Sequence, residues 1–179
     1  MPATARRVFA VAVCLVAIFL LAACGKDGEL SLESYFERLE EIDKQSSERT
    51  DALGDRIDMI SEESLPDQER IDAARSAVPE FVASFQEFLT GLDKLKPPEE
   101  VRKEHEEALA AGDATIAYFN NLATNVVKAK SIAELDQAMS LLVSPEFTLA
   151  DGRFTNSCLA LQAAAEENRI DVSLACGGG

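Results

Sequence analysis

Apolar residues recur at intervals of three and four along most of the chain, and this period restricts the fold more than any other feature. One such stretch consists of Ile71, Ala74, Val78, Phe81, Phe85, Phe88, Leu92 and Leu95. Residues spaced in this way lie on one face of an α-helix. Residues 170–174 instead alternate apolar and polar side chains, which indicates a short extended segment. The sequence therefore predicts an all-α fold, an antiparallel helical bundle of four to five helices with a short extended C-terminal tail.

Proline and capping residues divide this pattern into separate helices. Pro79 lies inside one apolar stripe, but the phase of the stripe continues past it, which favours one kinked helix over two. Ser131–Glu134 is a capping box and begins a helix. Ser144-Pro145 ends or restarts a helix. These signals predict helices over about 31–63, 67–95 and 98–130, a fourth helix from 131, and a last helix that ends near 168.

The first 23 residues have the three parts of an export signal. Arg6 and Arg7 give a positive start, residues 8–23 form an unbroken apolar run, and Ala22-Ala23 supply small residues at its end. The run has only 16 residues, whereas a membrane-spanning helix needs roughly 17–25. We therefore expect residues 1–23 to be a cleaved signal peptide rather than a transmembrane helix.

The residues that end this signal are Leu21-Ala22-Ala23-Cys24, which resemble the lipobox of bacterial lipoproteins. The resemblance implies cleavage before Cys24 and a diacylglycerol on its thiol, with palmitate among the acyl chains. It also implies a place in the bacterial cell envelope, on the outer side of the cytoplasmic membrane or on the outer membrane. The membrane is then a partner through the lipid anchor on Cys24. An ordinary secreted protein, whose cleavage happens to leave a cysteine at the new N-terminus, is the alternative.

The signal and the anchor define the domains that we expect. Residues 24–30 form a lipidated tether, and residues 31–179 form one helical bundle domain. Residues 158–176 resemble the tail of uncharacterised bacterial lipoproteins, which implies no activity.

Acidic residues dominate the expected mature chain. Residues 1–23 contain two arginines and no acidic residue, so 15 basic and 32 acidic residues remain, with a formal charge of −17. Such a surface repels polyanions, which excludes nucleic acid as an expected partner. It is also repelled by anionic lipids, which leaves the acyl chains as the main hold on the membrane.

The four cysteines have different expected roles. Cys14 leaves with the signal and Cys24 carries the lipid, so Cys158 and Cys176 remain. Two remaining cysteines in an exported chain favour a disulfide. A zinc site is disfavoured, because the chain has one histidine and no closely spaced cysteine pair. We expect no metal and no cofactor.

Most catalytic signatures are absent from the sequence, which contains no nucleophile elbow and no phosphate-binding glycine loop. His105-Glu106 begins like the zinc motif H-E-x-x-H, but Leu109 takes the place of the second histidine. We therefore expect a binding or scaffolding bundle and no enzyme, with an envelope protein or a small ligand as its partner. The alternative is an envelope enzyme that uses His105 with nearby carboxylates. The phenylalanines at 81, 85 and 88 are interpreted as core.

The first predicted helix has a polar gap in its apolar stripe, at Asp43, Ser46 and Thr50. In an up–down–up arrangement, this gap lies level with residues 78–82 of the second helix and 111–115 of the third. One hypothesis is a mid-bundle pocket for a small ligand, because such pockets combine a few polar groups with apolar walls. The alternative is that small residues let the helices pack closely there. The residues of this tentative pocket are Ser46, Thr50, Gly112 and Thr115.

Overall fold

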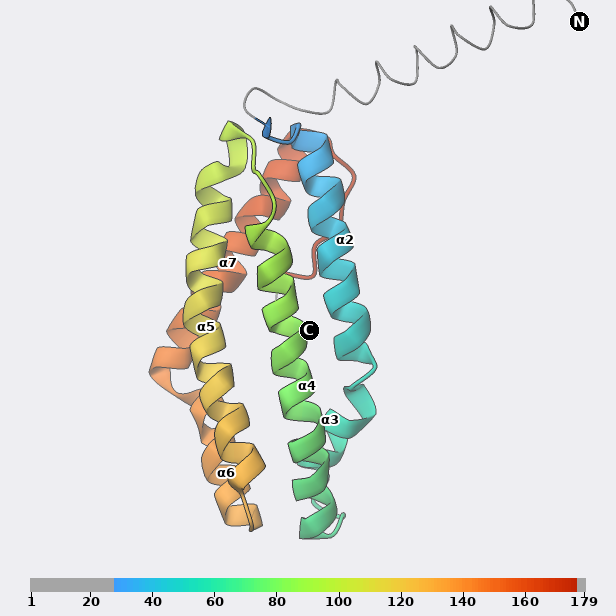
Figure 1. Ribbon diagram of the computed structural model, residues 1–179, viewed down its shortest axis with the longest axis vertical. Coiled ribbons are helices and arrows are strands. Elements are labelled where there is room, and N and C mark those ends of the chain that lie inside the picture. Colours follow the sequence, from blue (N-terminus) through green and yellow to red (C-terminus); the bar gives the residue numbers. More distant parts are fainter. Residues whose placement is uncertain (1–27, 177–179) are drawn as a thin grey trace, which may run out of the picture.

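The computed structural model describes residues 28–176, so the predicted signal peptide, Cys24 and most of the tether lie outside the described residues. Within this part of the chain there are six α-helices and no strand, which confirms the predicted all-α bundle (Figure 1). The helices are α2 (Leu32–Asp51), α3 (Gly54–Ser61), α4 (Asp67–Asp93), α5 (Arg102–Lys128), α6 (Ile132–Met139) and α7 (Pro145–Glu167). Two short 3₁₀ helices, η2 (Glu99–Val101) and η3 (Ser140–Val143), precede α5 and α7.

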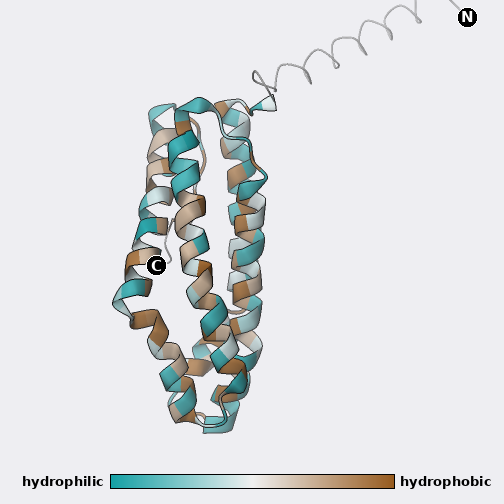
Figure 2. Ribbon diagram, turned by 60° about the vertical axis from the view of Figure 1, so that its left-hand side comes forward, coloured by the Kyte–Doolittle hydropathy of each residue, from teal (hydrophilic) through white to brown (hydrophobic). Residues whose placement is uncertain are grey.

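Neighbouring long helices run in opposite directions (Figure 1). α2 and α3 follow one another along one side of the bundle, α4 returns beside them, α5 runs antiparallel to α4, and α7 returns beside α5. α6 lies at the end where α4 begins. Hydrophilic and hydrophobic residues interleave along these helices, as expected for amphipathic helices around a core (Figure 2). Within residues 28–176, no helix combines the length and the apolar character that crossing a membrane requires.

The first predicted helix is in fact divided in two. α2 ends at Asp51 and α3 begins at Gly54, with a turn at residues 52–53. Glycine is a poor helix former, which favours a break at this position. Leu53 stays buried in the turn, so the apolar spacing keeps its phase and periodicity alone does not reveal the break. This division accounts for a sixth helix beyond the four to five predicted.

The other predicted boundaries agree with the structure. α4 passes through Pro79 as one helix rather than two. Ser131 caps α6 by accepting a hydrogen bond from the Glu134 N–H (3.3 Å), while the Glu134 carboxylate accepts one from the Lys130 N–H (2.6 Å). Ser144 caps α7 in the same way, directly before a proline at the first helical position.

The core consists of two clusters joined by aromatic side chains. The cluster nearest the start of α2 contains Tyr35, Phe36, Leu39, Leu92, Leu95, Val101, Ala108, Leu161 and Ala165. The cluster at the opposite end includes Ile60, Ile71, Val82, Phe119, Leu122, Val126 and Leu135. Phe154 of α7 packs edge-on against both Phe85 and Phe88, with ring centroids 5.3 and 6.0 Å apart. The phenylalanines of α4 are half-buried and pack against the two clusters, Phe81 and Phe85 on one and Phe88 on the other, in agreement with the predicted core role.

The chain reverses direction at the end of α7. Arg169 has a left-handed backbone (φ 57°), and the Ile170 N–H donates to the Ala165 carbonyl (2.9 Å). This pattern is the Schellman motif, which commonly ends helices. The reversal sends residues 170–176 back along the bundle as the extended tail that the sequence predicted.

Candidate functional site

The four residues of the predicted pocket do not meet in one cavity. Ser46 faces α4, where its Oγ lies 3.4 Å from Ser84 Oγ. Gly112 faces another side of α4, and the Leu89 side chain occupies the space that a Cβ at 112 would need. Because residues 84 and 89 lie roughly 140° apart around a helix, α2 and α5 contact different faces of α4. The sequence analysis placed Gly112 level with residues 78–82 of α4, whereas Gly112 contacts Leu89, so both the level and the facing direction differ from the prediction.

The two threonine hydroxyls of this predicted pocket are bonded within their own helices. Thr115 is 1% exposed, and its Oγ1 donates to the Ala111 carbonyl (3.0 Å). Thr50 Oγ1 donates to the Ser46 carbonyl (3.1 Å). Local bonds of this kind satisfy a buried hydroxyl without a ligand. Gly112 and Thr115 therefore fit the alternative interpretation, in which small residues let the helices pack closely.

Ser46 does line a smaller pocket, between α2 and α4. Its volume is about 100 Å³, which is below the roughly 300–1,000 Å³ of typical small-molecule sites. Gly91 brings the two helices close, because a Cβ there would lie 2.9 Å from Ile42 Cγ2. Arg49 and Glu87, also in its lining, form an ion pair with one another. The pocket has the size for a few water molecules.

His105 lies in the core rather than in a cleft. It is 3% exposed, and its Nδ1 lies 3.1 Å from the hydroxyl of Tyr35, itself fully buried. Burial lowers the pKa of His105, although the charges of Glu106 and Asp93 oppose the shift. Burial also raises the pKa of the Tyr35 hydroxyl, with the charge of Glu104 adding to the effect. Both groups are therefore neutral at pH 7, and the pair joins α2 to α5 as a structural hydrogen bond.

The enzyme alternative required an open cleft in which His105 meets a second ionisable group. The group that His105 meets is a neutral, buried phenol. Within residues 28–176, no three His, Cys, Asp or Glu side chains are grouped so as to hold a metal ion.

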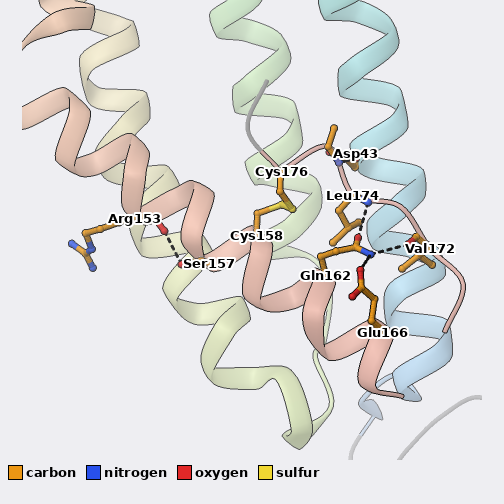
Figure 3. Close-up of a disulfide and its surroundings, with 10 residues drawn as sticks. Asp43, Arg153, Ser157, Cys158, Gln162, Glu166, Val172, Leu174 and Cys176 are labelled. Atoms are coloured by element: carbon orange, nitrogen blue, oxygen red, sulfur yellow. Dashed lines mark hydrogen bonds between the residues drawn. A yellow bond between two sulfur atoms is a disulfide. The ribbon is translucent and has the colours of Figure 1, made fainter. Parts of the chain in front are cut away.

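The tail occupies the seam between α7 and α2 (Figure 3). A disulfide joins Cys176 to Cys158 of α7, with the Cα atoms 5.3 Å apart, which is the pairing that the sequence predicted. The Gln162 side chain binds the tail backbone twice, donating to the Val172 carbonyl (3.1 Å) and accepting from the Leu174 N–H (3.0 Å). Side chains at 170, 172 and 174 pack on the core cluster.

Two carboxylates of α2 hold the other side of the tail. Glu40 accepts from the Ser173 N–H and Asp43 from the Ala175 N–H, both at 2.8 Å. Burial raises the pKa of Asp43, the bond from Ala175 opposes this shift, and the charge of Glu40 adds to it. The raised pKa means that protonated Asp43 stabilises the folded state. This stabilisation is complete below the ordinary pKa of 3.8 and is lost as the pH rises through the raised pKa of the folded protein.

We therefore expect Asp43→Asn to be more stable than the wild type at pH 7, because an amide keeps an acceptor for Ala175 without a charge to desolvate. The advantage should shrink as the pH falls and disappear below about pH 4, where the carboxyl is protonated in both states. Urea unfolding at several pH values measures it. Glu41→Gln, an exposed change two residues away, is the control and should show no such trend. An advantage that stays constant with pH would contradict the assignment.

A groove between α4 and α5 is the feature that the sequence analysis missed. It has a volume of about 730 Å³ and includes Leu89, Asp93, Glu106, Leu109, Asp113 and Ile116 in its lining. A signal was present on α5, where acidic and apolar residues each recur at a spacing of seven, at 106 and 113 and at 109 and 116. The matching face of α4 could be recognised only once the two helices were placed side by side.

The start of the described chain is fixed to one end of the bundle. The Leu30 N–H donates to the Lys96 carbonyl (3.0 Å) in the connection between α4 and α5. Glu29 forms an ion pair with Arg102 at the start of α5 (2.6 Å). We call this end, with residues 29–31 and 96–102, the tether end.

No family model, curated protein or solved structure matches the chain.

Proposed function

We propose that this protein is a bacterial lipoprotein, held at the cell envelope by a diacylglycerol on Cys24, whose helical bundle serves as a binding or scaffolding module. The observation that carries the proposal is the sequence Leu21-Ala22-Ala23-Cys24 at the end of an apolar run, directly before a charged segment. Two acyl chains give stable membrane attachment, whereas a single chain gives only marginal, reversible binding.

The geometry at the tether end supports this proposal. Three residues lie between Cys24 and Gly28, and an extended chain over these four Cα-to-Cα steps spans at most about 14 Å. Because residues 29 and 30 bind the connection between α4 and α5, the anchor holds the tether end next to the membrane. A helix of the length of α4 is about 40 Å long, so the opposite end, with α3 and α6, projects away from the lipid.

The disulfide also supports an exported location, since such bonds persist in oxidising compartments and are rare in the cytosol. The acidic surface fits the same picture. Exposed carboxylates keep the bundle hydrated beside anionic lipids, so the acyl chains supply the attachment.

The test compares two cysteine variants in native membranes. Cys24→Ser should lose the acyl label from radioactive palmitate, and its signal should remain uncleaved or the protein should leave the membrane fraction. Cys14→Ser removes a thiol ten residues earlier in the signal and should keep both the label and the membrane location. Retention of the label by Cys24→Ser, or its loss from both variants, would contradict the proposal.

A further inference from the structure

We propose that the groove between α4 and α5 binds an amphipathic helix of a partner protein, one that carries Lys or Arg beside an apolar stripe. The inference rests on the proposed binding role of the bundle and is independent of the lipid anchor.

The floor of the groove is apolar. Leu89 of α4 fills the space left by Gly112, and Leu109 and Ile116 flank this contact on α5. Leu109 packs on one core cluster and Ile116 on the other, so the groove crosses the junction between the two. Residues 106–116 extend about 15 Å along α5, which is the length of nearly three helical turns.

The sides of the groove carry unpaired negative charge. Asp93, Glu106 and Asp113 are all exposed, and within residues 28–176 none of them forms an ion pair. The groove lining contains no Lys or Arg.

At its contacts with α2 and α3, by contrast, α4 carries carboxylates that form ion pairs. Glu87, at the contact with α2, pairs with Arg49, and Glu80, at the contact with α3, pairs with Arg56. The chain thus supplies cations of its own at those two contacts and leaves the carboxylates of the groove without one.

A helix fits this combination of shape and charge. Apolar residues of a docked helix would cover Leu109 and Ile116, as in other complexes in which a helix lies in a hydrophobic groove. Glu106 and Asp113 are seven residues apart, so cations two turns apart on the partner would reach both. Charge complementarity selects a basic partner and speeds its association. The partner would add a further helix to the bundle, beside α4 and α5.

The test uses the purified full-length protein in phosphatidylcholine nanodiscs, with empty nanodiscs subtracted. The probe is a labelled helical peptide of about 18 residues, some 27 Å long, with leucines at helical spacing and lysines beside them. Fluorescence anisotropy at about 0.15 M salt measures its affinity. We expect saturable binding, and no binding of a peptide with glutamate in place of lysine.

Two matched pairs of variants locate the site. Ala110→Arg places a cation in the groove and should weaken binding about tenfold or more, whereas Ala160→Arg, at an exposed position of α7, should not change it. Replacing Asp93, Glu106 and Asp113 with their amides should weaken binding about fivefold. The same change of charge at Glu37, Glu41 and Glu48 of α2 should have less than half of that effect.

Circular dichroism verifies that each variant is folded. If both members of either pair lost the same affinity, the peptide would be attracted to the acidic surface as a whole. That result would overturn the proposal. Binding of the glutamate peptide, or no binding of the lysine peptide to the wild type, would also overturn it. None of these results depends on whether Cys24 carries a lipid. A failure of this proposal can therefore be distinguished from a failure of the proposed lipid anchor.

Discussion

Replacing both Cys158 and Cys176 with alanine is expected to lower the free energy of unfolding by about 3 kcal/mol, because the bond closes an 18-residue separation in the unfolded chain. The tail should respond before the helices. Its own hold on the bundle consists of a few hydrogen bonds and three apolar side chains, and two of those bonds, to Glu40 and Asp43, are exposed. Without the disulfide, these contacts must offset the entropy of ordering the tail.

Chemical denaturation measures the loss of stability, and amide hydrogen exchange shows where it occurs. The N–H groups of Ser173 and Ala175 should exchange faster in the variant, while those of α4 and α5 change only through global stability. Reduction of the wild type with a thiol should reproduce the effect and should leave the variant unchanged. An unchanged unfolding midpoint with protected tail amides would contradict the role assigned to the disulfide.

Truncating Leu135 to alanine is expected to cost about 2–5 kcal/mol, as for other buried leucines. Leu135 is 1% exposed and is the largest buried side chain of α6, a helix of eight residues that depends on packing for its stability. Leu149→Ala is the matched control. Leu149 is 69% exposed on α7, so the same chemical change there should alter stability by less than about 0.5 kcal/mol.

Urea denaturation of the two variants measures this difference. Similar effects at both positions would show that Leu135 is not part of a packed core, and α6 would then have to be held by its capping bonds alone.

Local signals in the sequence predicted most of the helix boundaries. Ser131 and Ser144 begin helices because each hydroxyl accepts a backbone N–H that would otherwise be unpaired. The turn before Gly54 escaped prediction because Leu53 stays in phase with the stripe on either side. The pairing of Cys158 with Cys176 could be inferred because only these two cysteines of the expected mature chain remain free once Cys24 carries the lipid.

Contacts between distant residues were harder to predict. Tyr35 and His105 are 70 residues apart, and nothing local marks them as partners. The residues of the tentative pocket lie apart because periodicity gives neither the exact level at which two helices meet nor which neighbour each face of α4 contacts. Gly112 contacts Leu89 rather than residues 78–82. The groove between α4 and α5 likewise depends on the packing of Leu89 against Gly112, a contact that exists only in the folded chain.

The most direct test of the central claim is the intact mass of the N-terminal peptide from protein extracted from native membranes. We predict that the chain begins at Cys24 and that a diacylglycerol is attached to its sulfur through a thioether. A mature chain that begins at another residue, or one that begins at Cys24 with an unmodified thiol, would contradict it.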